Sequence, residues 1–245
     1  MLEASLALAW AGRDDPPPDL GIERLPPRDW LAENQAGFPP LRAGRYFIHG
    51  SHYRARPPAG TIALCIDAAT AFGSGEHATT RGCLLALDAL ARRRRFARVL
   101  DMGTGSGILA MAAAKTWRRR VMARDIDAEA VRVAARNAAA NGMGSLLDLR
   151  RADGYRGLGS GQPFDLVFAN ILARPLVLMA PALARVLAPG GVAVVSGLLA
   201  RQERAVLAAH RARRLRLRRR IRLAGWHSLV LARGHTRLSS LREDA

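Results

Sequence analysis

From residue 98 onward, short apolar runs alternate with longer segments in which apolar residues recur with the period of a helix. The apolar runs are ARVLDMG, RVMARD, LLDLRRAD, FDLVFAN and GVAVVSG, and the helical segments span residues 108–117, 128–141 and 176–187. Strands that alternate with helices form a parallel sheet covered by helices on both faces. We therefore expect one α/β domain with a Rossmann-like sheet over residues 98–234.

The end of this domain has a different pattern. After a helical segment at 202–210, two strand-like runs, RRLRLRRRIRL and WHSLVLAR, are separated only by Ala224 and Gly225, which predicts a tight antiparallel hairpin. The prediction is thus a seven-stranded, mostly parallel sheet with a terminal antiparallel hairpin. In the first run, apolar residues alternate with arginines, as in an edge strand with one face in water. Contact with nucleic acid is the alternative interpretation of these arginines.

The chain before residue 98 divides into two parts. Residues 1–40 contain the proline-rich turns DDPPPDL and LPPRDW and are expected to be a tether. Residues 41–97 form a leading module with the β-prone runs RYFIHG and TIALCID, the loop AFGSGEHATT, and a helix that starts at Thr79 and ends in the arginine run ARRRRF. Residues 235–245 are expected to be a tail.

Composition adds little to this picture. The formal charge of +18 suggests an acidic partner, but only Lys115 among the 38 basic residues is a lysine, which points to the coding composition of the genome as a further source of charge. Neither a secretion signal nor a long apolar span is visible, and the two cysteines show no disulfide or metal spacing. We expect a cytoplasmic protein without a metal site.

The strongest chemical signal is VLDMGTGSG, in which a strand enters a glycine-rich turn that opens a helix. Such a turn lets a ligand approach the backbone at a helix N-terminus. Asp101 precedes the glycines, where an acid suits a ligand with an amino group, and Asp125 ends the next strand, where an acid can hold ribose hydroxyls. A dinucleotide site shares the second feature, but its glycine spacing differs.

The loop AFGSGEHATT, residues 71–80, resembles a phosphate cradle with one exception. Glu76 follows the last glycine, where a phosphate-binding loop has a lysine. A carboxylate repels phosphate, so the loop more plausibly meets a zwitterionic or cationic ligand.

The joint pattern resembles the class I S-adenosylmethionine-dependent methyltransferases. That resemblance implies that Asp101 lies near the methionine amino group, that Asp125 binds the ribose, and that the three glycines make room for the cofactor. The glycines are Gly103, Gly105 and Gly107.

Two further residues take roles from the same resemblance. Asp153, after the third strand, matches the adenine-contacting acid of the family, with a solvated turn as the alternative. Asn170, in FANILARPL after the fourth strand, lies where this fold meets the methyl acceptor, and its amide can accept a hydrogen bond from an amine and orient it. The alternative for Asn170 is a helix cap.

Taken together, AFGSGEHATT, DMGTGSGILA, DID and ANILA resemble the ribosomal large-subunit protein eleven methyltransferase family, whose loop has the form FGxGxHxTT. The resemblance runs from about Asp29 to about Arg233 and implies S-adenosyl-L-methionine as cofactor, with Thr80 beside it. It implies a protein-lysine N-methyltransferase that acts on ribosomal large-subunit protein eleven, with the N-terminal α-amine as an optional second target. Ser74 and Ala78 replace the threonine and proline of many relatives.

Two alternatives stay open at this stage. One is a related methyltransferase with another substrate, such as the β subunit of electron-transfer flavoprotein. The other is a non-catalytic RNA-binding protein with this fold, in which the arginines contact ribosomal RNA. The family also implies an N-terminal substrate-binding domain, and only a short segment precedes Asp29. We therefore expect either a gene start placed too late or a reduced substrate grip.

Overall fold

The computed structural model describes residues 10, 40–67, 78–158 and 161–234. The expected tether, apart from residues 10 and 40, and the expected tail therefore lie outside the described residues. So do residues 71–77 of the loop AFGSGEHATT, including Ser74 and Glu76. No helix in the described ranges is long and apolar enough to span a membrane.

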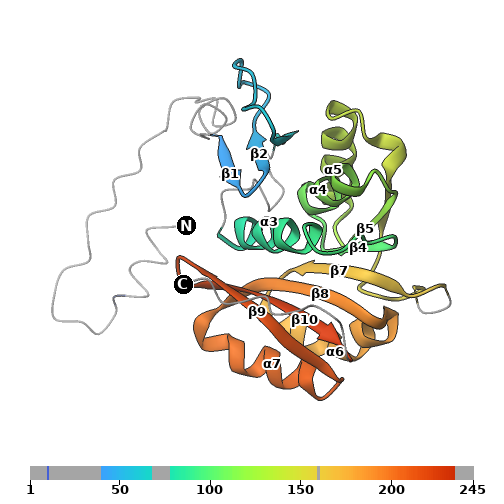
Figure 1. Ribbon diagram of the computed structural model, residues 1–245. Coiled ribbons are helices and arrows are strands. Elements are labelled where there is room, and N and C mark those ends of the chain that lie inside the picture. The colour runs from blue at the N-terminus through green and yellow to red at the C-terminus, as the bar shows by residue number, and fades with distance from the viewer. Residues whose placement is uncertain (1–9, 11–39, 68–77, 159–160, 235–245) are drawn as a thin grey trace.

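A seven-stranded sheet forms the centre of the molecule (Figure 1). Its order is β6-β5-β4-β7-β8-β10-β9, in which β4 to β8 run parallel and β10 pairs antiparallel with both β8 and β9. The strands are β4 (Val99–Met102), β5 (Val121–Asp125), β6 (Leu147–Arg151), β7 (Phe164–Asn170), β8 (Leu187–Leu199), β9 (Leu215–Leu223) and β10 (Trp226–Arg233). The predicted sheet and its terminal hairpin are confirmed.

Helices cover both faces of the sheet, as predicted (Figure 1). One face carries α3 (Ala78–Ala91), α4 (Ile108–Trp117) and α5 (Ala128–Ala140), and the other carries α6 (Ala173–Val186) and α7 (Glu203–Arg211). Short 3₁₀ turns at Gly144–Leu146 and Ala200–Gln202 complete the main domain. Alternate residues of β7 enter the two cores: Phe168 packs on the α3–α4 side and Val167 on the α6–α7 side. The two-residue period of a central strand thus fills both layers.

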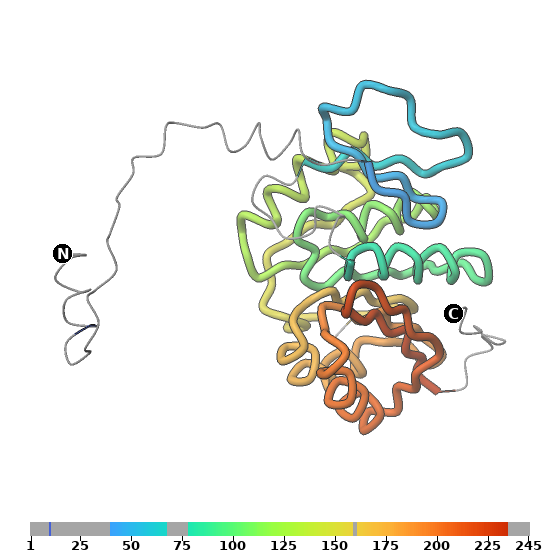
Figure 2. Tube along the Cα trace, turned by 90° about the vertical axis from the view of Figure 1, so that its left-hand side faces the viewer, coloured from blue at the N-terminus to red at the C-terminus, as the bar shows by residue number. Residues whose placement is uncertain are grey.

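A small sheet of β1 (Leu41–Ala43), β2 (Tyr46–His49) and β3 (Ile62–Cys65) lies over α3, α4 and α5, as the blue segment of Figure 2 shows. Polar contacts fix it there. The Tyr46 hydroxyl lies 2.8 Å from Thr116 Oγ1, and the Asn141 side chain bonds both the backbone N–H and the carbonyl of Cys65. The described part of the leading module therefore shares one core with the main domain.

Two predicted helix boundaries were wrong. Helix α6 begins at Ala173 rather than Leu176. Pro175 is tolerated in its first turn, because the N–H groups of a first turn have no acceptor inside the helix and proline therefore breaks no hydrogen bond there. Helix α3 ends at Ala91, so the arginine run follows the helix instead of forming its last turn. Arg92 still bonds back to Asp88, 2.9 Å away.

The expected hairpin turn and edge strand are both present. Ala224 and Gly225 have φ of 48° and 78°, the positive pair that a tight hairpin of this twist requires. Strand β9 is the outer strand of the sheet, with Leu215 fully buried and Arg216 exposed. Water on one face of this strand explains why arginines alternate with apolar residues.

Candidate active site

A cavity of about 610 Å³ opens at the carboxyl ends of β4, β5 and β7. This is the edge at which parallel α/β sheets bind ligands, because the connections there diverge to either face. Sequence-predicted residues on its wall are Thr80, Gly103, Gly105, Asp125, Asp153 and Asn170. Residues that were not predicted for the site complete the lining, and most of them are apolar.

The glycine turn forms the floor of this cavity. Gly103 has a φ of +73°, and a Cβ atom there would lie 2.3 Å from the Ile171 side chain, so only glycine fits. Gly103 and Gly105 line the cavity, whereas Gly107 faces α5. A Cβ atom added at Gly107 would lie 3.0 Å from the Cβ of Ala134. Gly107 therefore lets α4 pack closely on α5 and does not reach the cavity wall.

Asp101 lies behind the glycine turn and is 1% exposed. Its Oδ2 accepts hydrogen bonds from Thr104 Oγ1 at 2.7 Å and from the Ala110 N–H at 3.1 Å, so it fixes the turn to the start of α4. Its Oδ1 has no partner among the described residues. Burial raises the pKa of Asp101 to about 7, the charge of Asp125 adds to this, and the two hydrogen bonds oppose it.

This raised pKa predicts a pH-dependent stability. Between the ordinary pKa of 3.8 and about 7, the unfolded chain ionises Asp101 while the folded chain keeps the proton, so stability falls as pH rises through this window. The side chain of Asp101→Asn does not titrate. The free energy of unfolding of this variant, compared with that of the parent, should therefore rise between about pH 5 and about pH 8. The rise should be at most about 1.4 kcal/mol for each unit of pKa difference. Denaturant titrations at both pH values measure this, and a constant difference would contradict it.

Asp125 connects the second strand to the glycine turn. It is the last residue of β5, it is half-buried, and its Oδ2 accepts the Gly105 N–H at 2.9 Å. Its Oδ1 accepts the Asp127 N–H at 3.0 Å, which turns the chain into α5. Asp153, on the loop after β6, also lines the cavity, with an exposed side chain 3.3 Å from Arg156.

Asn170 and Thr80 meet on the wall of the cavity. Asn170 Nδ2 donates to Thr80 Oγ1 at 3.3 Å, and Asn170 Oδ1 is buried without a partner among the described residues. The N-cap of α6 is Leu172, so Asn170 is not the helix cap that the alternative interpretation required. The pair thus orients the Asn170 amide at the cavity wall and leaves the hydrogen-bonding capacity of its oxygen unused among the described residues.

Buried hydroxyls hold the start of α3, and with it Thr80, against the sheet. Ser196 of β8 and Ser228 of β10 lie 2.7 Å apart, and each donates to the Thr79 carbonyl at 3.5 Å. Gly82 gives them room, because a Cβ there would lie 2.3 Å from Ser228 Oγ. The antiparallel hairpin therefore supports the position of Thr80.

Sequence reasoning missed the apolar wall of the cavity. The wall residues come from six separate parts of the chain, and those inside the quoted motifs were not assigned a contact with the ligand. Ile126 and Leu172 line the cavity although they are 63% and 67% exposed, so they leave apolar surface open to solvent there. The wall residues that were not predicted are Met102, Thr104, Ile108, Leu109, Ile126, Ala152, Gly154, Ile171, Leu172, Pro175, Met179, Gly197 and Trp226.

The chemistry of this lining fits a cofactor with an amino group, ribose hydroxyls and a flat apolar ring. Asn170 Oδ1 and, behind the wall, Asp101 Oδ1 are buried without a partner among the described residues, and Asp125 lies on the wall itself. Apolar side chains supply the remaining contact area. The described residues contain no group of three or more potential metal ligands.

Comparison with known proteins decides the family. A family model described as ribosomal protein L11 methyltransferase matches residues 7–234, which extends upstream of Asp29. The chain belongs to the ribosomal protein L11 methyltransferase family. As a member, it is an S-adenosylmethionine-dependent methyltransferase, and the resemblance seen in the sequence is confirmed.

Individual members of the L11 methyltransferase family agree. The protein of Rhodopseudomonas palustris is 45% identical over 228 residues, covering 92% of this chain and 77% of that protein. That of Rhizobium meliloti is 49% identical over 218 residues, covering 87% and 75%. The crystal structure of the L11 methylase of Lactobacillus delbrueckii subsp. bulgaricus has 29% identity and a TM-score of 0.71, and covers 81% of this chain and all of that one.

Proposed function

We propose that this protein transfers methyl groups from S-adenosylmethionine to amino groups of ribosomal protein L11, namely lysine side chains and the N-terminal α-amine. The single observation that carries the acceptor chemistry is the buried, unpaired Asn170 Oδ1, oriented by Thr80 on the wall of the cavity. The substrate follows from the relatives, which are named as L11 methyltransferases over most of the chain.

Each polar residue of the site would contact a different part of the cofactor. Asp125 would accept hydrogen bonds from the ribose hydroxyls, and Asp101 Oδ1 would face the methionine amino group. Asp153 would contact the adenine, and Gly103 and Gly105 leave the space for the backbone of the ligand. When bound, S-adenosylmethionine supplies an electrophilic methyl group on a positively charged sulfur.

The acceptor amine must be neutral before it reacts, because a protonated amine has no lone pair, and a lysine ammonium has an ordinary pKa near 10.4. Asn170 Oδ1 would accept an N–H from the neutral amine and so direct its lone pair along the axis of attack, which is an effect of proximity and orientation. Among the described residues of the wall, Thr80, Gly197 and Trp226 share it with Asn170, and none of these three side chains is a base. In this mechanism the amine loses its proton to solvent before it binds.

The two alternatives from the sequence receive less support. Family membership favours ribosomal protein L11 over the electron-transfer flavoprotein subunit as substrate. A non-catalytic protein would have no need for a buried, oriented amide beside a cavity of this size. The cavity and the unpaired acceptors thus favour an enzyme over a protein that keeps the fold only to bind RNA.

Mass spectrometry of intact ribosomal proteins, from cells with and without this gene, tests the proposal. L11 should be lighter by one or more methyl groups when the gene is deleted, and a plasmid copy should restore its mass. A plasmid that carries Asn170→Ala is the matched control, because the variant should fold and bind cofactor but restore little methylation. An unchanged L11 mass on deletion, or a mass change confined to another protein, would contradict L11 as the substrate.

A further inference from the structure

The second notable surface lies at the other end of the sheet from the cavity, where the parallel strands begin. Two loops meet there: the segment between α3 and β4, and the segment between α4 and β5. The rings of Phe96 and Trp117 pack edge to face with centroids 5.3 Å apart and hold the loops together. Five of the arginines that these loops expose line the two hollows described below and are here called the arginine edge: Arg95, Arg98, Arg118, Arg119 and Arg120.

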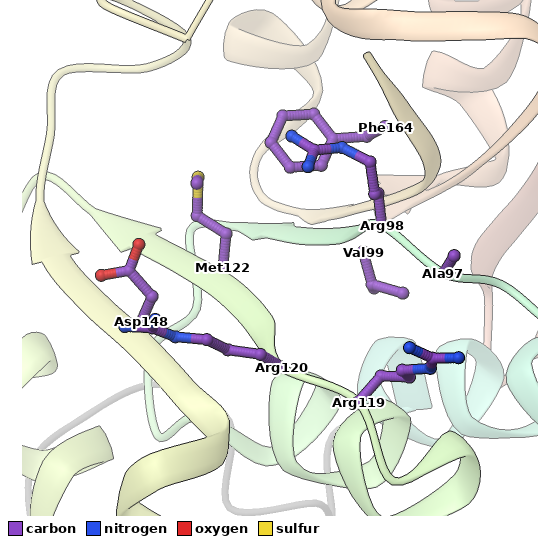
Figure 3. A pocket seen from close by; sticks show the side chains of 8 residues that line it. All are labelled: Ala97, Arg98, Val99, Arg119, Arg120, Met122, Asp148 and Phe164. Atoms are coloured by element: carbon purple, nitrogen blue, oxygen red, sulfur yellow. The ribbon is translucent and has the colours of Figure 1, made fainter. Parts of the chain in front are cut away.

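The arginine edge is continuous and hollowed. One hollow of about 400 Å³ is lined by Arg95, Arg118 and Arg119. A second, of about 350 Å³, is lined by Arg98, Arg119 and Arg120, and Figure 3 shows these side chains around it with Phe164 and Asp148. Ala97 and Arg119 belong to both hollows, so the two form a single positively charged surface.

No carboxylate in the described part of the chain forms an ion pair with the arginine edge. The two nearest acids are already engaged. Asp148 pairs with Arg124 and Arg150, each at 2.9 Å, and Asp165 accepts the backbone N–H groups of Ala97 and Arg98. The positive charge of the arginine edge is therefore left for a partner.

The arginine edge is better suited to an anion than the arginine-rich terminal hairpin. On the hairpin, Arg220 is held by both carboxylate oxygens of Glu203, and Arg218 donates to the Gly234 carbonyl. At the arginine edge, Arg98 is the only side chain with a partner among the described residues, namely the Gln162 carbonyl and the face of the Phe164 ring. The sequence placed RNA contact on the hairpin. Arg216 and Arg222 of the hairpin are also exposed, but the engagement of Arg218 and Arg220 interrupts that row, which favours the surface at the amino ends of the parallel strands.

We propose that the arginine edge binds the phosphate backbone of RNA. Guanidinium groups are the side chains best matched to phosphate oxygens, and a row of them follows a repeating anion. Phe164 is buried beneath Arg98, so no aromatic face is free for base stacking, and binding should be tolerant of sequence. The choice of RNA over other polyanions rests on the proposed ribosomal substrate. The observation that the surface is positively charged and hollowed is independent of that proposed function.

Because the arginine edge and the cavity lie at opposite ends of the parallel strands, RNA and cofactor occupy separate sites. RNA binding is therefore measured on the full chain without cofactor or L11, by fluorescence anisotropy of a labelled single-stranded RNA over a series of salt concentrations. Failure of the proposed methylation would leave this measurement unaffected, and a failure here would leave the methylation assay unaffected.

The test variant is Arg95→Gln/Arg119→Gln/Arg120→Gln. The matched control, Arg211→Gln/Arg216→Gln/Arg222→Gln, removes the same charge from exposed arginines of α7 and β9. The test variant should lose at least about tenfold in affinity, and the slope of log K against log salt should fall by about 2, for three lost phosphate contacts on a single strand. The control should lose far less, and both should keep the parent melting temperature and cofactor affinity.

Two results would overturn the proposal. Equal losses in the test and control variants would mean that RNA responds only to net charge. If polyglutamate of equal charge displaced the RNA as well as unlabelled RNA does, the arginine edge would be a site for acidic peptides instead.

Discussion

Asp125→Ala is expected to lower the affinity for S-adenosylmethionine by about 10- to 100-fold, which corresponds to the roughly 1.5–3 kcal/mol of charge-assisted hydrogen bonds. Two effects combine. The ribose hydroxyls would lose the carboxylate that accepts their hydrogen bonds. The Gly105 N–H would also lose its acceptor, Asp125 Oδ2, whose distance from the Gly105 nitrogen is 2.9 Å and which holds the glycine turn in place. Isothermal titration calorimetry of the cofactor measures the sum of both effects.

Two control variants separate these effects from a general loss of stability. Asp125→Asn keeps an acceptor oxygen for one partner and should fall between the parent and the alanine variant. Asp127→Ala removes the N-cap of α5, whose side chain accepts the Glu129 N–H at 2.9 Å outside the cavity. It should cost about 1 kcal/mol of stability and leave cofactor affinity unchanged. Parent-like affinity of Asp125→Ala would show that Asp125 does not hold the ribose.

Asn170→Ala is expected to slow methyl transfer by about 100-fold, the scale of rate loss when a reacting group is misplaced by about 1 Å. Cofactor affinity should change little, because the proposed partner of Asn170 Oδ1 is the acceptor amine. Single-turnover kinetics with L11, at saturating cofactor, separates the chemical step from binding. A variant that keeps the full turnover rate would remove Asn170 from the mechanism.

Thr80→Val tests how the amide is oriented. The change removes the hydroxyl that accepts from Asn170 Nδ2 while keeping the shape of a fully buried side chain. If Thr80 acts by orienting Asn170, the double variant should be no slower than Asn170→Ala alone. Additive rate losses would instead give Thr80 a separate contact with cofactor or substrate.

The two ends of the central sheet differ in their electrostatic character. At the carboxyl ends of the strands, acids and an amide surround an apolar cavity, which suits a cofactor with a positively charged sulfur and amino group. At the amino ends, exposed arginines lack acidic partners within the described residues. Because the strands of the main domain are parallel, their direction keeps the cofactor site and the proposed RNA surface apart.

The sequence by itself determined the features that depend on short-range spacing. The strand, glycine turn and helix from Val99 to Trp117 form a continuous unit, and Asp125 follows at the end of the next strand. The Ala224-Gly225 turn was predictable because few residue pairs adopt the backbone angles of a tight hairpin. Family membership was also visible in these motifs, although the roles of residues in the loop 71–77 remain predictions, since they lie outside the described residues.

Only the tertiary structure decided which distant residues share a site. Thr80 and Asn170 are separated by 90 positions, and Gly197 and Trp226 join them from two further strands. Likewise, the arginine run that follows Ala91 was expected to end a helix. It lies beside the segment between α4 and β5 because Phe96 packs on Trp117. The physical reason is that local periodicity fixes the direction and faces of each element, whereas strand order and helix packing determine which ends of these elements converge.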